Sequence, residues 1–102
     1  MEDDAADEIL KTRLVTVRGV VQGIGYREAC IHRADDLGVT GWVRNRMDGS
    51  VEAMVQGSPE QLAAMCVWLR KGMSAALVDG FEVTELAPPF ARFDSFEQLP
   101  TL

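Results

Sequence analysis

The sequence contains few cysteines and histidines and no long apolar run. Its 102 residues include two cysteines and one histidine, too few for a disulfide-stapled domain or a histidine-based metal site. No apolar run approaches the roughly 18 residues that a membrane-spanning helix needs. Residues 1–8 are acidic rather than apolar, so we expect no secretory signal. We therefore predict a cytoplasmic protein with reduced thiols and no membrane partner.

Charge is unevenly distributed along the chain, whose net charge is −6. Residues 1–8 contain five acidic residues, and residues 47–102 contain eight acidic residues against three basic ones. Residues 9–46, in contrast, contain seven basic and only three acidic residues. The positive charge of this stretch suits a small anionic ligand, whereas the acidic chain as a whole does not favour nucleic acid.

Patterns of apolar and turn residues divide the chain into an acidic flexible tail, residues 1–11, and one domain, residues 12–102. Alternating and β-branched residues predict four strands, over 12–21, 39–46, 50–56 and 76–86, and a short fifth strand over 92–99. Apolar residues at helical spacing predict two helices, over 25–37 and 59–71. No repeat, low-complexity segment or linker interrupts this pattern.

Two short segments carry the most specific local signals. Ser58, Pro59 and Gln61 form a capping box with proline at the first helical position, which predicts where the second helix begins. Asp48 and Gly49 predict a type I′ hairpin turn, in which both central residues need a positive φ. These signals fix one helix start and one strand-to-strand connection.

The predicted order is strand, helix, strand, strand, helix, strand, followed by a short tail. Two helices of about 13 residues cannot cover both faces of a four-stranded sheet. The economical arrangement is an α+β, ferredoxin-like βαββαβ sandwich, in which an antiparallel sheet carries both helices on one face. Right-handed crossovers would place the first strand centrally, with its exit loop beside the first helix.

That exit loop, Gly19–Arg27 (GVVQGIGYR), has the residues needed to hold a phosphate-sized anion. Gly23 and Gly25 permit a positive φ, which can aim successive amides at one point, and the helix N-terminus adds unpaired donors. The loop matches neither glycine-rich nucleotide motif, since no G-K-[ST] follows it and position 28 is glutamate. Arg27 has the wrong sign for the first turn of a helix, and a bound anion would offset that penalty. A plain turn, with Arg27 exposed or paired with Glu28, explains the same residues equally well.

Asn45 is the second unusual residue, because asparagine is depleted in strands and yet follows a clear strand pattern here. It could be a turn-entry residue of the hairpin, or its amide could orient a ligand or a water molecule. Cys30 and Cys66 lie on apolar helix faces, and neither is followed by arginine at the Cys-x5-Arg spacing of a cysteine phosphatase. We therefore assign both thiols to the core.

The two unusual stretches together resemble the acylphosphatase family. Gly19–Arg27 matches the loop pattern G-x-V-Q-G-[VH]-x-[FY]-R apart from Ile24, and Gly41–Val51 matches G-[FYW]-[AVC]-[KR]-N-x-x-x-G-x-V. The similarity covers about residues 13–96. The chain departs from the family at residues 96–100, where the usual aromatic-ended last strand is replaced.

The resemblance implies hydrolysis of the carboxylic–phosphoric mixed anhydride of acyl phosphates to a carboxylate and inorganic phosphate. It implies that Arg27 and Asn45 are catalytic, with Asn45 positioning the attacking water. It also implies that the phosphoryl group is held by Arg27 and the preceding loop residues, namely Gln22, Gly23, Ile24, Gly25 and Tyr26. No metal or cofactor is expected, inorganic phosphate should be both product and inhibitor, and we expect a monomer.

The alternative is a non-catalytic ferredoxin-like module that binds a small molecule or regulates other domains. An RNA-binding domain of this fold would need exposed aromatics on its central strands, where this sequence has Val15, Val17, Val51 and Val55. A regulatory module, or an acylphosphatase-like module of hydrogenase maturation, fits the same pattern. Hydrolysis of a small aryl acyl phosphate by the pure chain would separate enzyme from module.

Overall fold

A computed structural model describes residues 10–102. Its elements are β1 (Lys11–Val20), α2 (Tyr26–Leu37), β2 (Thr40–Asn45), β3 (Val51–Gly57), α3 (Pro59–Lys71), β4 (Leu77–Glu85) and β5 (Phe96–Gln98). The predicted element order is confirmed, and the four long strands and both helices begin and end within one residue of their predicted bounds. Lys11, which we assigned to the acidic tail, is the first residue of β1, and residues 1–9 of that tail lie outside the described residues.

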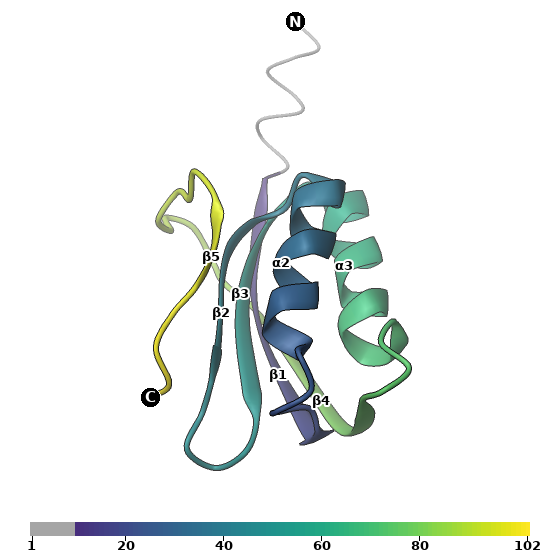
Figure 1. The fold of residues 1–102 in the computed structure, drawn as a ribbon. Helices are drawn as coiled ribbons and strands as arrows, with labels where there is room; N and C mark the ends of the chain where they lie inside the picture. The colour runs from purple at the N-terminus through teal and green to yellow at the C-terminus, as the bar shows by residue number, and fades with distance from the viewer. Residues whose placement is uncertain (1–9) are drawn as a thin grey trace, which may run out of the picture.

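The five strands form one sheet in the order β4-β1-β3-β2-β5 (Figure 1). β1, β2, β3 and β4 pair in antiparallel fashion, as predicted. β5 instead runs parallel to β2, with Phe96 opposite Gly41, so the complete sheet is mixed rather than antiparallel. The α+β, ferredoxin-like arrangement is confirmed, and the short fifth strand predicted over residues 92–99 is observed over fewer residues, as β5 at the edge of the sheet.

Both helices cover one face of the sheet, and the core lies between these two layers (Figure 1). Strand alternation turns every second residue of β1 and β3 toward the helices. The fully buried apolar side chains on these two strands are Val15, Val17, Val51, Ala53 and Val55. They meet Cys30 and Ala34 of α2 and the Leu62, Met65 and Leu69 stripe of α3. The central strands therefore present valines to the core, as the sequence predicts.

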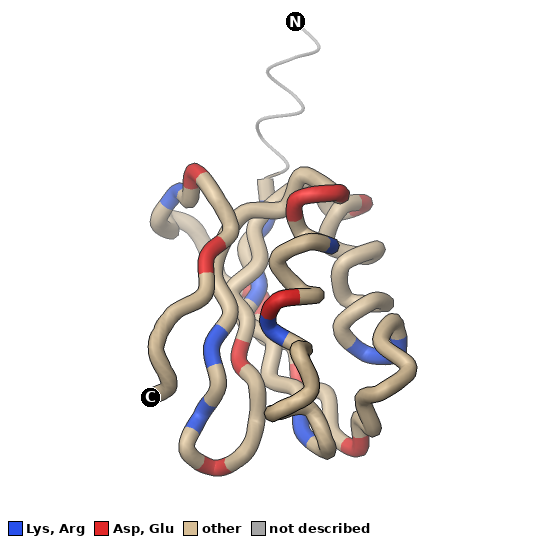
Figure 2. The backbone as a smooth tube through the Cα atoms, in the orientation of Figure 1, with Lys and Arg blue, Asp and Glu red and all other residues tan. Residues whose placement is uncertain are grey.

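The other face of the sheet is partly covered by the chain between β4 and β5. Gln56 of β3 is buried beneath it and donates to the carbonyl of Ala91 at 2.7 Å and to the Thr12 hydroxyl at 2.8 Å. Its side-chain oxygen accepts from the amide of Phe93 at 3.0 Å. Gln56 thus holds the segment that leads to β5 at the sheet edge. Elsewhere along the strands, charged residues of both signs occur (Figure 2).

The hairpin between β2 and β3 does not contain the predicted type I′ turn. Gly49 has φ 93°, but Asp48 does not have the positive φ that this turn requires. The amide of Gly49 donates to the carbonyl of Arg46 at 3.1 Å, and the amide of Arg46 donates to the carbonyl of Ser50 at 2.8 Å. This is a three-residue loop with a glycine bulge, the other common hairpin connection. The prediction of a hairpin is confirmed, and its turn type is wrong.

Candidate active site

The loop between β1 and α2 carries an unsatisfied row of backbone donors. Gly23 and Gly25 have φ values of 78° and 80°, as predicted, and a Cβ at either position would meet no atom within 4 Å. No side chain caps α2, whose N-cap is Gly25. Among residues 10–102, the amides of residues 23–28 donate to no backbone acceptor. Successive free N–H groups in a loop and at a helix start form a binding site for an anion.

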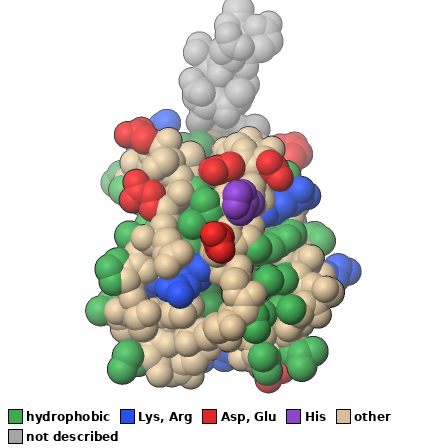
Figure 3. Space-filling model, in the orientation of Figure 1, with side chains coloured by type: hydrophobic (Ala, Val, Ile, Leu, Met, Phe, Trp, Pro, Cys, Tyr) green, Lys and Arg blue, Asp and Glu red, His purple; other side chains and the backbone are tan. Residues whose placement is uncertain are grey.

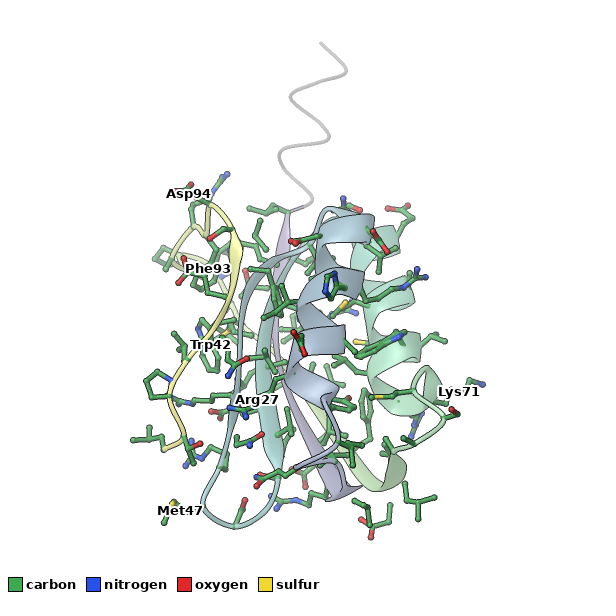
Figure 4. The ribbon with its side chains drawn as sticks, in the orientation of Figure 1. Arg27, Trp42, Met47, Lys71, Phe93 and Asp94 are labelled. Atoms are coloured by element: carbon green, nitrogen blue, oxygen red, sulfur yellow. The ribbon has the colours of Figure 1, made fainter. Side chains whose placement is uncertain are left out.

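Arg27 adds a full positive charge beside these amides. Basic side chains gather on the face where the first turn of α2 adjoins β2 (Figure 3). The Arg27 side chain extends from α2 toward β2 (Figure 4). It is half-buried and forms no ion pair or side-chain hydrogen bond with any residue of the described chain, Glu28 included. The guanidinium is therefore available to an anion, and the pairing with Glu28 that we considered is absent from the structure.

Asn45 ends β2 and faces the same space. Its backbone is held on both sides, because it pairs with Val51 of β3 and its carbonyl accepts from the amide of Leu102 at 3.2 Å. Its side-chain oxygen, Oδ1, is buried and has no hydrogen-bond partner within residues 10–102. A buried acceptor without a donor is costly unless a ligand or a water molecule supplies one. This observation favours the functional interpretation of Asn45 over a turn-entry role.

Gln22 links the loop to the hairpin that follows Asn45. Its side-chain nitrogen donates to the carbonyl of Arg46 at 2.9 Å and to the carbonyl of Ser50 at 2.8 Å. Both protons of the amide are thereby used within the protein. Its side chain therefore sets the distance between the loop and the end of β2, a role that the sequence did not suggest.

These groups meet in one small pocket of about 90 Å³. It is lined by Val21, Gly23, Gly25, Tyr26, Arg27, Glu28, Asn45 and Gln98. Five of these are predicted site residues, whereas the predicted residues Gln22 and Ile24 are not in the lining. Ile24 packs against the hydrophobic core instead. The pocket is far smaller than the about 300 Å³ that a drug-sized ligand needs, so it suits a small anion.

The sequence analysis missed three lining residues, namely Val21, Glu28 and Gln98. Glu28 follows Arg27 directly and could have been included from its position in the first turn of the helix. Gln98 reaches the pocket only because β5 pairs with β2 in parallel. That pairing joins residues more than fifty positions apart, and no local pattern signals it.

Two other reactive side chains, those of Cys30 and Tyr26, are buried in the core. Burial raises the pKa of the Cys30 thiol to about 12, so the thiolate nucleophile is not available near neutral pH. Burial also raises the pKa of Tyr26, whose hydroxyl donates to the carbonyl of Leu69 at 2.6 Å. Cys66 is only partly buried and, like Cys30, is a free thiol.

No helix within residues 10–102 is long and apolar enough to cross a membrane.

Comparison with known proteins shows the family of the chain. The family model for acylphosphatase matches residues 13–98. A curated relative from Ralstonia nicotianae, acylphosphatase 1, is 74% identical over 93 residues, covering 91% of each chain.

Two solved structures agree in fold. An acylphosphatase from Coxiella burnetii superposes with a TM-score of 0.84 at 29% identity, covering 92% of this chain and 97% of that one. The acylphosphatase from Bacillus subtilis superposes with a TM-score of 0.80 at 31% identity, covering 88% and 98%. The chain thus belongs to the acylphosphatase family and is a hydrolase that splits acyl phosphates.

Proposed function

We propose that Arg27 and the loop of residues 22–27 hold the phosphoryl group of the acyl phosphate, and that Asn45 positions the attacking water. The free amides of Gly23 to Arg27 and the guanidinium would donate to the non-bridging phosphoryl oxygens. The buried Oδ1 of Asn45 would accept a hydrogen bond from the water and so direct an oxygen lone pair at phosphorus. Gln22 would contribute through the hairpin carbonyls that it binds, rather than by touching substrate.

The chemistry of the substrate suits this set of groups. Phosphoryl transfer depends mainly on positioning and on stabilising charge at the equatorial oxygens. Water forms the new P–O bond as the bond to the acyl oxygen breaks, and the acyl group leaves as a carboxylate. Because a carboxylic acid has a pKa near 4, this leaving group needs no general acid. The water proton can pass to a phosphoryl oxygen of the substrate, so the reaction needs no side-chain base.

One observation carries the proposal: three kinds of unsatisfied group converge on one small pocket. They are the free loop amides, the unpaired Arg27 guanidinium and the Asn45 side chain, whose oxygen has no partner within residues 10–102. The buried Asn45 oxygen costs folding free energy when it lacks a partner, and Arg27 has the unfavourable charge for a helix start. A bound phosphoryl group with its attacking water would satisfy all three together.

The same donors should bind inorganic phosphate, so we propose that phosphate is both product and competitive inhibitor.

One chain supplies every group of the pocket, which supports activity as a monomer. Sedimentation at the concentration of the assay tests that state. The two free cysteines are typical of a reducing compartment, so we propose a cytoplasmic location, which cell fractionation tests.

The test is hydrolysis of benzoyl phosphate by the purified chain and by matched variants. Arg27→Ala should lose phosphate binding and turnover together, whereas Asn45→Ala should lose turnover and keep phosphate binding. Arg92→Ala is the control, because Arg92 is an exposed arginine outside the pocket. Phosphate binding by the wild-type chain without hydrolysis would instead support the non-catalytic module.

A further inference from the structure

Two lining residues of the pocket have no part in the proposed chemistry. Glu28 and Gln98 are exposed at its edge, Glu28 in the first turn of α2 and Gln98 at the end of β5. Neither side chain forms a hydrogen bond or ion pair within the described chain, residues 10–102. Val21 and Tyr26 are buried, and the Tyr26 hydroxyl is bound to a carbonyl. Glu28 and Gln98 are therefore the exposed side chains of the lining that the acyl group could meet as it leaves the pocket.

The in-line geometry of phosphoryl transfer decides between these two residues. The attacking and leaving oxygens lie on opposite sides of phosphorus. Asn45, which positions the water in the proposed function, stands at the end of β2, and Gln98 stands on β5, the strand paired with β2. The other lining residues come from the loop before α2 and from the first turn of α2, which includes Glu28. The leaving acyl group should therefore extend toward Glu28 and away from Gln98.

Glu28 places a negative charge on that side of the pocket. The face around the pocket shows acidic side chains next to the basic patch (Figure 3). A carboxylate near a protein surface interacts with a second charge over several ångströms, although salt screens the interaction. An anionic substituent on the acyl group would be repelled there, whereas a cationic one would be attracted.

We propose that Glu28 determines acyl specificity, so that the enzyme disfavours acyl phosphates with an anionic acyl group and prefers neutral or cationic ones. This inference rests on the proposed function, because it uses the position of the water at Asn45. It concerns only the acyl end of the substrate. Loss of the Glu28 charge should relieve repulsion of an anionic acyl group, and hydrolysis itself does not require that charge.

The experiment compares three aryl substrates that differ only in the para substituent: benzoyl, para-carboxybenzoyl and para-trimethylammoniobenzoyl phosphate. We expect Glu28→Gln to raise kcat/KM for the carboxylated substrate, relative to benzoyl phosphate, by about five-fold at low salt. The ratio for the cationic substrate should fall. Glu28→Lys should extend both changes, and high salt should reduce them. Because each ratio is compared between variants, differences in intrinsic leaving-group reactivity cancel.

Two controls locate the effect. Glu60→Gln removes the equivalent first-turn acid of α3, which does not line the pocket, and should leave every ratio unchanged. Gln98→Glu adds a charge on the β5 side of the pocket and should shift the ratios less than Glu28→Gln does. An equal change for all three substrates in Glu28→Gln would show that Glu28 acts only on the phosphoryl group, and would overturn the proposal.

A binding measurement keeps the test independent of turnover. Phenacylphosphonate and para-carboxyphenacylphosphonate are stable analogues of the neutral and anionic substrates. Calorimetric titration should show weaker binding of the carboxylated analogue, and Glu28→Gln should reduce that difference. Absence of benzoyl phosphate hydrolysis would refute the proposed function, whereas equal affinities of wild-type protein for the two analogues would refute the role of Glu28.

Discussion

The two helices of this protein begin in opposite ways. At the start of α3, the Ser58 hydroxyl accepts from the amide of Gln61 at 3.1 Å, and the Gln61 side chain accepts from the amide of Ser58 at 2.8 Å. At the start of α2, Gly25 adopts a left-handed conformation and no side chain caps the helix. Both helices pack on the same face of the same sheet, so the difference is local.

The difference separates a site that stabilises the fold from a site that binds a ligand. The capping box of α3 satisfies backbone donors within the chain, and Gln61 also donates to the carbonyl of Leu37 at the end of α2 at 3.0 Å. The start of α2 leaves its donors free, and places Arg27 where the helix dipole disfavours a cation. A glycine at the N-cap costs only a few tenths of a kcal/mol relative to serine. The uncapped helix is the one whose donors remain available to an anion.

We expect the largest loss of activity when the cation at the start of α2 is removed. Arg27→Ala should lower kcat/KM for benzoyl phosphate by about a hundred-fold or more, or about 3 kcal/mol of transition-state stabilisation. Arg27→Lys should restore little, because an ammonium cannot donate in a fork to two phosphoryl oxygens. Steady-state kinetics of both variants check this. Near-normal activity of Arg27→Ala would mean that the Arg27 guanidinium does not hold the phosphoryl group in the transition state.

Substitution of Asn45 should separate the loss of turnover from the loss of phosphate binding. Asn45→Ala should lower kcat by about a hundred-fold, since misplacing a reacting group by about 1 Å has that cost. Phosphate should still compete with substrate, because the loop amides and Arg27 are unchanged. Inhibition constants for phosphate, measured in wild type and variant, check the split. Loss of phosphate binding by a folded Asn45→Ala protein would show that Asn45 holds the anion itself.

Binding of the product, inorganic phosphate, to the free donors at the start of α2 should stabilise the fold. A ligand that binds only the folded state at a hundred times its Kd raises the free energy of unfolding by about 2.7 kcal/mol. Phosphate should therefore raise Tm with concentration, and chloride at matched ionic strength should do much less. The increase should vanish in Arg27→Ala and persist in Asn45→Ala. An equal increase in wild type and Arg27→Ala would place the anion elsewhere on the protein.

Removing the N-cap of α3 should lower the stability of the fold without affecting the site. Ser58→Ala should lower the free energy of unfolding by about 1 kcal/mol, or Tm by about 4 to 8 °C for a domain of this size. Its phosphate affinity and kcat should not change. Gly25→Ala is the matched variant at α2, where a positive φ disfavours alanine although its Cβ has room. It should lower both stability and phosphate affinity, and thermal melts with phosphate titrations check the contrast.

The same contrast explains how much could be predicted from the sequence. The start of α3 was located to the residue, because Ser58, Pro59 and Gln61 carry the whole signal within four positions. Arg27 and Asn45 each break a local preference, for charge at a helix start or for residue type in a strand, but those patterns leave a structural explanation open. Only the resemblance to the acylphosphatase family assigns the two residues to the site. The edge of the pocket was not found, because Gln98 arrives through a pairing between distant segments.

The hairpin shows the limit of a local signal even where it is strong. Asp48-Gly49 predicts a tight turn, but two turn types share that dipeptide. The structure selects the bulged form, in which only Gly49 takes a positive φ. The reason lies in the Asp48 side chain, which accepts from the amide of Ser50 at 2.9 Å and from its hydroxyl. Asp48 therefore satisfies a nearby backbone donor in the way that Ser58 does.

The smallest expected effect tests whether Asp48 stabilises its turn as Ser58 stabilises α3. Hydrogen bonds from the Ser50 hydroxyl and amide, with a weaker contribution from Arg18, lower the pKa of Asp48 from 3.8 to about 2. A carboxylate with a lowered folded-state pKa stabilises the fold above its unfolded pKa, and this contribution is lost as pH falls through about 2. Asp48→Asn should therefore lower Tm slightly at neutral pH, and the difference from wild type should shrink between about pH 4 and pH 2. Asp94→Asn, at an exposed position outside the helices and strands, measures what the loss of one negative charge does by itself. A difference between wild type and Asp48→Asn that stayed constant down to pH 2 would show that the charge of Asp48 does not hold the hairpin, and that its oxygen alone does.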